Sequence, residues 1–314
     1  MNALLFPGQG VQKVGMLSEI FDIEDETKDF IKSAADDLDF DLVELITSGP
    51  EEKLNLTEFA QPAILAASIA ITKSKKINNK IDYTAGLSLG EYSALVYADC
   101  LEFSDALRLV NYRGKLMQNA VPEGTAGMLV VLNMDLKEVY KMIEIINSSD
   151  EEINFSTDNA NGVSVLAGKN SAIEACKDYI SKNDFKRVKT QMVQMSVPSH
   201  CYLLEDAQKE LGKLLYKIEF KEPKIPVIPN VLAKPTTDVS VIKSSLINQL
   251  TSTVRWRETL TYLLENNVQH VFDSGPGKTI INMARKIKDI EKTSFIFIVK
   301  RILTFFTQRN YIPF

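Results

Sequence analysis

The sequence has little that would indicate a secreted, metal-binding or membrane protein. It holds only three cysteines, namely Cys100, Cys176 and Cys201. They are widely spaced with no C-x-x-C pair, so we expect neither a disulfide framework nor a metal site. The N-terminus has no basic segment and reaches Pro7-Gly8 too soon for a signal peptide. The apolar segment 295–306 is interrupted by Lys300 and Arg301 and is too short to span a bilayer. These absences favour a cytoplasmic protein.

The charge balance is weakly acidic. The chain has 36 lysines and arginines against 41 aspartates and glutamates, a formal net charge of -5. Phosphate binding needs a basic field, so we expect no nucleic-acid partner and no membrane surface. The 314 residues, 45% of them hydrophobic, suit one large domain with an insertion, or two domains.

A Gly-x-Ser-x-Gly motif occupies residues 86–90 of a chain with only 14 glycines. It follows a strand-like run and precedes a helix-compatible one, which is the context of a nucleophile elbow. Flanking glycines let strand and helix approach while the serine projects from the turn. The serine then lies at a helix N-terminus, which favours developing negative charge. We predict Ser88 as the nucleophile; a chance match in an ordinary loop is the alternative.

Other segments carry weaker signals. Residues 3–6 read as a buried strand that Pro7-Gly8-Gln9-Gly10 ends, and open α/β sheets bind ligands at such loops. A plain strand-to-helix connection is the alternative. A strongly apolar helix is expected over residues 57–71, with Pro62 tolerated only in its first turn. Ser104 is the expected N-cap of a further helix that runs to about residue 120.

Arg113 falls on the apolar stripe of that last helix, with Ala106 and Met117. Burying a lone charge is prohibitive, so we expect the guanidinium to meet a carboxylate. On the residues alone two partners are equally open. One is an internal acid such as Glu91 or Asp99, and the other is the carboxylate of a substrate.

The pattern changes between residues 125 and 195. The predicted order is β-α-β-β-α-β, the ferredoxin-like unit, which closes on itself. We expect strands at 128–132, 153–157, 163–167 and 187–193, helices at 136–146 and 172–180, and a turn at 159–162. We therefore predict an inserted small domain over residues 125–195, with residues 1–124 and 196–314 forming the main domain.

A serine nucleophile needs a base, and the chain has only two histidines. An ordinary position at the edge or end of a strand explains the presence of His270. His200 lies in an irregular stretch at the return from the inserted domain, and catalytic groups concentrate on loops carried by a rigid scaffold. We therefore favour His200 as the base. No acidic residue is evident as a third triad member, and a backbone carbonyl would serve equally to orient the imidazole.

Seven motifs together resemble the bacterial malonyl-CoA:acyl-carrier-protein transacylases, an acyltransferase family. They are LFPGQG at residues 5–10, TEFAQPA at 57–63, GLSLGEYSAL at 86–95, RGKLM at 113–117, SVPSH at 196–200, QL and VRW within 249–256, and GPG at 275–277. Each motif is weak alone, but seven in the same order are highly specific. The match runs from the first strand to about residue 300.

The resemblance implies both a fold and a reaction. The fold is an α/β-hydrolase-like large domain with a mostly parallel sheet and the ferredoxin-like insertion, with the active site in the gorge between them. Ser88 would attack malonyl-CoA with His200 as base, and the malonyl ester would pass to the phosphopantetheine thiol of acyl carrier protein in fatty acid biosynthesis. No permanently bound cofactor or metal is implied, because the coenzyme A thioester is a substrate. A cytoplasmic monomer is expected.

The resemblance also implies roles for further residues. The backbone N–H groups of Gln9 and Leu89 would form the oxyanion hole, and the main-chain carbonyl of Gln249 would orient His200. Arg113 would bind the free malonyl carboxylate in a bidentate pair, which favours the substrate over an internal acid. The residues expected to line the pocket are Gln61, Asn161 and Ser199.

Two positions depart from the family, and other functions stay open. Leu87 stands where many members carry histidine, and the tail 300–314 matches nothing in the family. A serine hydrolase would share the elbow but normally shows an acidic triad member. A non-catalytic carrier-protein docking module would be expected to lose Ser88 or His200. The small side chain of Ser199 would admit a branched malonyl unit, although malonyl itself is expected.

An acidic carrier protein would need a local basic patch on this acidic chain. The candidates are Lys186, Arg187 and Lys189 in the inserted domain, and the cluster around Lys75. Ordinary solvation is the alternative for each lysine taken singly.

Overall fold

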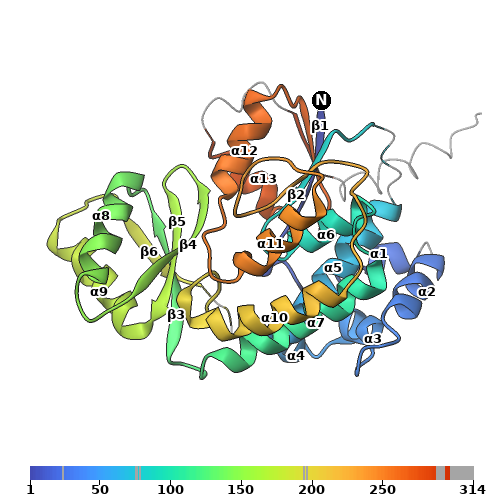
Figure 1. Ribbon diagram of the computed structural model, residues 1–314, viewed down its shortest axis with the longest axis horizontal. Coiled ribbons are helices and arrows are strands. Elements are labelled where there is room, and N and C mark those ends of the chain that lie inside the picture. The colour runs from blue at the N-terminus through green and yellow to red at the C-terminus, as the bar shows by residue number, and fades with distance from the viewer. Residues whose placement is uncertain are drawn as a thin grey trace, which may run out of the picture.

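The computed structural model describes the chain except residues 23–24, 75–76, 78, 194, 196, 288–293 and 298–314. Its strands form two separate sheets, and Figure 1 shows β3 to β6 on the left with β1 and β2 to their right. The strands are β1 Asn2–Phe6, β2 Tyr83–Gly86, β3 Ala126–Leu132, β4 Ile153–Ala160, β5 Val163–Lys169, β6 Lys189–Met192, β7 Val227–Ile228, β8 His270–Asp273 and β9 Ser294–Phe297. The helices are α1 Ser18–Phe21, α2 Asp25–Ala34, α3 Leu42–Ser48, α4 Glu51–Asn55, α5 Thr57–Ser74, α6 Gly90–Tyr97, α7 Phe103–Ala120, α8 Leu136–Asn147, α9 Asn170–Lys182, the 3-10 turn η1 Tyr202–Leu204, α10 Glu205–Lys217, α11 Val239–Gln249, α12 Trp256–Glu265 and α13 Thr279–Ala284.

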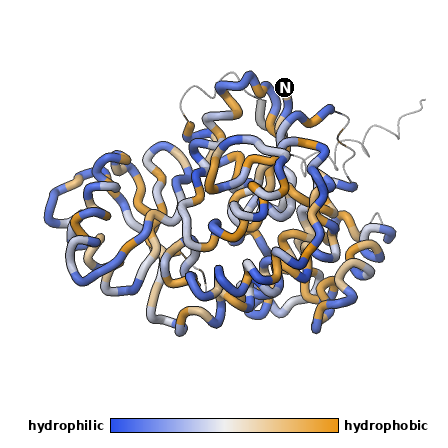
Figure 2. Tube along the Cα trace, viewed as in Figure 1, coloured by the Kyte–Doolittle hydropathy of each residue, from blue (hydrophilic) through white to orange (hydrophobic). Residues whose placement is uncertain are grey.

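The larger sheet is parallel throughout, in the order β7-β2-β1-β8-β9. Successive side chains of β1 point to opposite faces. Leu4 and Phe6 join the core formed with α5, α6 and α7, whereas Ala3 and Leu5 join the core formed with α12 and α13. Helices therefore cover both faces, which explains why β1 is apolar at every buried position. Figure 2 shows the hydrophobic stretches gathered inside this domain.

The smaller sheet is antiparallel, in the order β4-β5-β3-β6. Helices α8 and α9 pack on one of its faces around Leu129, Val139 and Ile173, which form a core separate from those of the large sheet. Order and pairing match the β-α-β-β-α-β prediction, and the predicted fold class is confirmed. The exact limits at residues 125 and 195 stay a prediction.

A short stretch of backbone pairing joins the two parts. Thr157 on β4 forms an isolated parallel bridge with Val254, just before α12. The N–H of Asp158 donates to the Val254 carbonyl and the N–H of Val254 donates to the Ser156 carbonyl, each at 2.9 Å. Strand β4 therefore reaches from the small sheet to the segment just before α12 and ties the two parts together there.

Three local predictions are wrong. Helix α5 begins at Thr57, so Pro62 lies beyond its first turn. Proline lacks the N–H that would bond the Glu58 carbonyl, and the side-chain amide of Asn111 on α7 donates to that carbonyl instead, at 2.9 Å. Ser104 is inside α7, whose N-cap is Glu102. Strand β4 runs to Ala160, so the predicted four-residue turn is reduced to two residues.

Candidate active site

The sequence around Ser88 folds into a sharp turn between β2 and α6. Strand β2 ends at Gly86, α6 begins at Gly90, and Ser88 between them has φ +52°. A Cβ on Gly86 would lie 1.8 Å from the carbonyl carbon of Gly90, and one on Gly90 would lie 2.4 Å from the Phe6 oxygen. Only glycine fits at either position. The turn has the tightness and the serine conformation of a nucleophile elbow.

His200 lies directly against Ser88. Its Nε2 is 2.7 Å from Ser88 Oγ, and its Nδ1 is 2.6 Å from the main-chain oxygen of Gln249. A carbonyl oxygen can only accept, so Nδ1 must carry the ring proton. Nε2 is then left as an acceptor for the serine O–H. The geometry gives the imidazole the tautomer that a general base requires.

The surroundings keep this imidazole uncharged. Only 2% of His200 is exposed. Burial, reinforced by the positive charge of Arg113, lowers the pKa of His200 to about 3, against the opposing effect of its hydrogen bond to Gln249. A neutral ring can accept a proton, so burial makes the base available across the physiological pH range.

The loop that carries His200 is anchored to the small sheet. The Ser156 hydroxyl on β4 donates to the Ser199 carbonyl at 2.9 Å. The Ser199 hydroxyl itself faces Met128 Sδ of β3 at 3.4 Å. His200 has φ +58°, a left-handed conformation that costs energy for a non-glycine residue. The small sheet therefore helps to hold the imidazole in place, and Ser199 contacts two of its strands.

Arg113 is the most deeply buried cation near this pair, with 1% exposure. Its Nη1 donates to Gln61 Oε1 at 2.8 Å and its Nη2 donates to Gln249 Oε1 at 3.1 Å, while Nε has no partner among the described residues. Burial lowers its pKa. Asp99, one of the internal partners that the sequence left open, is not paired with Arg113, since its carboxylate lies 2.7 Å from Lys224 Nζ.

Glu91, the other proposed internal partner, is also not paired with the guanidinium. Its Oε2 accepts from the N–H of Asn230 at 2.9 Å and from Gln249 Nε2 at 2.8 Å. The hydrogen bonds of Arg113 Nη1 and Nη2 thus go to neutral amide oxygens, and the guanidinium also lies over the ring of Tyr92, 5.7 Å from the centroid. The guanidinium keeps its full positive charge in a dry site.

Sequence reasoning missed Asn230 as a site residue. Its side chain accepts from the N–H of Ser88 and donates to the carbonyl of Gly86, each at 2.6 Å. Asn230 follows β7, which pairs with β2. The available signal was that Asn230 is a polar residue directly after a strand, and that this strand ends at the same edge of the sheet as the elbow.

The remaining predicted residues take varied places. Gly8 packs so closely that a Cβ there would lie 2.6 Å from the Leu87 oxygen, which brings the loop with Gln9 against the elbow. Leu89 is the N-cap of α6. Gln61, on α5, bonds Arg113 directly. Asn161 lies at the β4–β5 turn and lines a cavity of about 260 Å³ whose walls include Asp158 and Arg257 but none of the other predicted site residues.

His270 lies far from this cluster. It begins β8 and is paired with Asn2 at the start of β1. Because the sheet is parallel, both residues lie at its amino edge, whereas Ser88 follows the carboxyl end of β2. Roughly 3.3 Å per strand residue separates the two edges, so His270 is out of reach of the serine hydroxyl.

Other kinds of site are not evident in the described part of the chain. It contains no group of three or more His, Cys, Asp or Glu side chains suited to a metal ion. The three cysteines are free and buried. No helix among the described residues has the length and apolarity to cross a membrane.

Several known proteins are similar to this chain in sequence and in fold. A family model described as the acyl transferase domain matches residues 3–285. A malonyl CoA-acyl carrier protein transacylase of Staphylococcus aureus is 37% identical over 294 residues, 93% of this chain and 94% of that protein. The crystal structure of FabD from Acinetobacter baumannii superposes with a TM-score of 0.88 at 36% identity, covering 94% of this chain and 93% of that one. A malonyl-transacylase solved in complex with a type II PKS acyl-carrier protein gives the same TM-score and identity, 0.88 and 36%, over 94% of this chain and 95% of that one.

Proposed function

The chain belongs to the acyl transferase domain family, and we propose that it transfers a malonyl group from malonyl-CoA to the phosphopantetheine thiol of an acyl carrier protein in fatty acid biosynthesis. The observation that carries the proposal is a serine–histidine pair next to a fully buried arginine that forms no ion pair with a carboxylate of the described residues. One relative is named a malonyl CoA-acyl carrier protein transacylase, and a similar malonyl-transacylase was solved in complex with an acyl-carrier protein. A cytoplasmic monomer remains the expected form.

The first half-reaction forms an ester on Ser88. The hydroxyl gives its proton to His200 Nε2 as Oγ attacks the thioester carbonyl, and the carbonyl oxygen takes the negative charge. Collapse of this tetrahedral intermediate breaks the carbon–sulfur bond. His200 then gives the proton to the departing thiolate of coenzyme A. The 2.7 Å separation of Oγ and Nε2 supports direct proton transfer.

The transient oxyanion needs donors. We assign them to the backbone N–H groups of Gln9 and Leu89, since Leu89 caps the N-terminus of α6 and the loop with Gln9 packs on the elbow. A helix N-terminus adds the positive end of its dipole. Donors held by the main chain need no reorganisation as the charge develops.

The second half-reaction reverses the first with another thiol. An unperturbed thiol has a pKa of about 8.5, so the phosphopantetheine S–H needs a base near neutral pH. His200 Nε2, neutral again, takes that proton, and the thiolate attacks the malonyl-serine carbonyl. The carbon–oxygen bond to Ser88 breaks, and His200 returns the proton to Oγ. The enzyme is regenerated with the malonyl group on the carrier.

Arg113 supplies the selectivity for a carboxylated acyl group. Its bonds to the amide oxygens of Gln61 and Gln249 fix the plane of the guanidinium without neutralising it. An incoming malonyl carboxylate provides the missing negative charge in bidentate geometry. A simple acyl group would leave the buried charge unpaired, so its transfer is penalised.

Isotope exchange tests the ester mechanism. Labelled coenzyme A is incubated with unlabelled malonyl-CoA in the absence of carrier protein. We expect label to enter malonyl-CoA, because the ester on Ser88 reacts back with free thiol. His200→Ala should slow the exchange by about 10²–10⁴-fold, whereas the matched control His270→Ala should stay close to the parent. Exchange that requires carrier protein would contradict the two-step mechanism, and hydrolysis faster than exchange would favour a hydrolase.

A further inference from the structure

Glu91 is a buried acid in the candidate site that the reaction itself does not use. It lies in the first turn of α6 with 0% exposure, and none of the described cations forms an ion pair with it. Burial raises its pKa to about 7, despite the hydrogen bonds from Asn230 and Gln249 and the charge of Arg113. Such a costly group needs a reason to be retained.

Both of its hydrogen bonds fall on one oxygen. Glu91 Oε2 accepts from Gln249 Nε2 at 2.8 Å and from the N–H of Asn230 at 2.9 Å, whereas Oε1 has no partner in the described structure. The position of this single oxygen atom therefore determines the orientation of two neighbouring residues.

The first neighbour is the Gln249 side chain. Its Nε2 also donates to the Ser88 carbonyl at 3.1 Å, and its Oε1 accepts from Arg113 Nη2 at 3.1 Å. An amide can be turned end for end, and then its oxygen would face two acceptors and its NH₂ would face the guanidinium. An acceptor at Glu91 Oε2 makes that flipped arrangement unfavourable. The Gln249 side chain consequently always presents its oxygen to the Arg113 guanidinium.

The second neighbour is Asn230. With its N–H held by Glu91, its side chain spans the elbow between the Ser88 N–H and the Gly86 carbonyl. One buried oxygen is thus connected to the nucleophile turn on one side and to the guanidinium on the other. Neither connection brings Glu91 into contact with the reacting atoms.

We propose that Glu91 is a positioning residue that sets the acyl-group selectivity of this site, because its Oε2 fixes the Gln249 amide and thereby the orientation of Arg113. The inference rests on the proposed malonyl transfer. It assigns the effect to where the acceptor oxygen lies, and not to the charge of the carboxylate as a counter-ion for Arg113.

Two conservative variants separate the effect of the position of the acceptor oxygen at residue 91 from the effect of its charge. Glu91→Gln removes the charge but can place its amide oxygen where Oε2 lies, and this oxygen accepts from both donors. Glu91→Asp keeps the charge but withdraws the carboxylate by one methylene. Glu258→Asp is the matched control, since Glu258 bonds Arg255 in a partly exposed pair outside the site.

The measurement is the ratio of kcat/KM for malonyl-CoA to that for acetyl-CoA in the full chain. This ratio is independent of the folded fraction, so a partly unfolded variant still reports. We expect Glu91→Asp to lower the ratio by about tenfold or more, the effect of a misplaced bond to a buried charged group. Glu91→Gln should stay within about threefold of the parent, and Glu258→Asp should match it.

The outcomes separate this inference from the proposed function. A parent enzyme that does not prefer malonyl-CoA would overturn the proposed function itself. If the parent prefers malonyl-CoA, any pattern other than retention in Glu91→Gln with loss in Glu91→Asp overturns the role of Glu91. Loss in Glu91→Gln would identify the charge as the cause, and equal losses for both acyl groups would identify a structural role only.

Discussion

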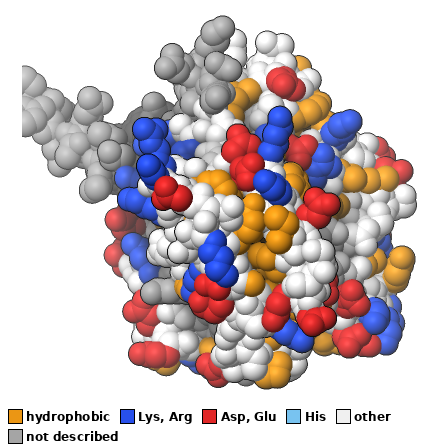
Figure 3. Space-filling view, turned by 90° about the vertical axis from the view of Figure 1, so that its left-hand side faces the viewer, with side chains coloured by type: hydrophobic (Ala, Val, Ile, Leu, Met, Phe, Trp, Pro, Cys, Tyr) orange, Lys and Arg blue, Asp and Glu red, His pale blue; other side chains and the backbone are white. Residues whose placement is uncertain are grey.

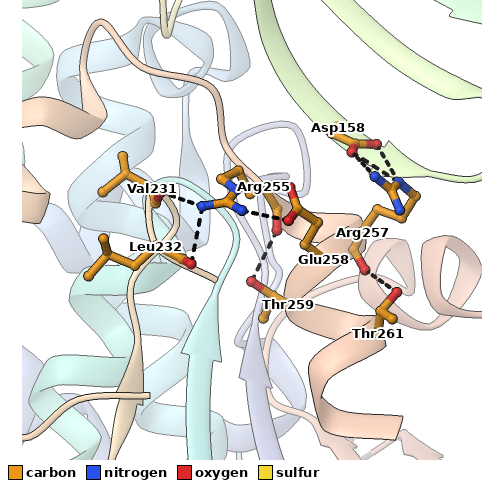
Figure 4. A network of polar contacts seen from close by, with 8 residues as sticks. All are labelled: Asp158, Val231, Leu232, Arg255, Arg257, Glu258, Thr259 and Thr261. Atoms are coloured by element: carbon orange, nitrogen blue, oxygen red, sulfur yellow. Dashed lines mark hydrogen bonds and ion pairs between the residues drawn. The ribbon is translucent and has the colours of Figure 1, made fainter. Parts of the chain in front are cut away.

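The regions around Arg113, which is fully buried, and Arg257, which is partly buried, handle a positive charge in opposite ways. Arg257 lies where β4 meets α12, and its guanidinium grips Asp158 with Nε at 3.0 and 2.9 Å from the two oxygens and Nη2 at 2.7 Å from one of them (Figure 4). Arg113 lies next to the elbow, and its Nη1 and Nη2 donate to amide oxygens. The pairing raises the pKa of Arg257, whereas burial lowers the pKa of Arg113.

The difference indicates a structural role for Arg257 and a ligand-binding role for Arg113. Arg257 receives its negative charge from its own chain, at the junction of the two sheets, so it contributes to the docking of the small domain. Arg113 is the more deeply buried of the two and lacks such a partner among the described residues. A protein tolerates that cost where a substrate supplies the missing charge.

Replacing each arginine gives the largest test of this contrast. Arg113→Ala should lower kcat/KM for malonyl-CoA by roughly two or more powers of ten while sparing acetyl-CoA, because the substrate loses its charge partner. Arg113→Lys should recover only part of the loss, since a point charge cannot form the fork. Steady-state kinetics with both thioesters measures the effect.

Arg257→Ala is the matched control for this experiment. It should lower the thermal midpoint and leave the ratio of the two kcat/KM values unchanged. The contrast fails if Arg113→Ala weakens both thioesters by the same factor, or if Arg257→Ala changes the ratio.

The same contrast applies to acids. Asp158 is paired with Arg257, whereas Asp273, at the end of β8, is buried with Oδ2 unpartnered in the described structure. Burial raises the pKa of both carboxyls, against the opposing bonds from Arg257 at Asp158, and the pKa of Asp273 rises from 3.8 to about 7. The folded state therefore binds the proton more tightly than the unfolded chain. Its stabilising contribution is full below about pH 4 and is lost as the pH rises toward 7.

Asp273→Asn should remove this loss. We expect the variant to exceed the parent in stability at pH 8 by on the order of a few kcal/mol, with the gap closing toward pH 4. Urea denaturation at a series of pH values measures the gap, with Asp158→Asn as a comparison that also loses an ion pair. Parallel pH profiles for Asp273→Asn and the parent would show that Asp273 carries no raised pKa.

The smallest expected effect concerns the surface, where charges are solvated. The small domain exposes Lys186, Arg187 and Lys189. Figure 3, which views the molecule from the side of the small domain, shows positive and negative side chains interspersed on that face. Charge reversal at these three positions should raise the KM for carrier protein severalfold and leave acylation by malonyl-CoA unchanged. Equal losses in both half-reactions would contradict a docking role. Lys75 lies outside the described residues.

Local patterns were sufficient for much of the fold. The elbow and the β-α-β-β-α-β unit were predictable because glycine spacing and hydrophobic periodicity act over a few residues. Helix α10 was missed although Ala207, Leu211 and Leu215 recur every fourth residue and are all buried. Pro62 was misjudged because its compensation comes from Asn111 on another helix.

The site was less accessible to sequence reasoning. Ser88 and His200 could be chosen as candidates from motif, context and elimination. The contacts that orient them run through Gln249, Asn230 and Glu91, which are brought together from segments more than 100 residues apart, such as the 139 residues between Glu91 and Asn230. No local pattern encodes such contacts. The apolar segment 295–306 is described only as far as the end of β9, and the tail 300–314 lies outside the described residues.

The most direct test of the central claim is the intact mass of the protein after brief exposure to malonyl-CoA without carrier protein. We expect a mass increase of one malonyl group, mapped by peptide analysis to Ser88 and absent from Ser88→Ala. Acetyl-CoA under the same conditions should give much less adduct. Labelling of another residue, no labelling at all, or equal labelling by both thioesters would contradict a malonyl-transferring serine enzyme.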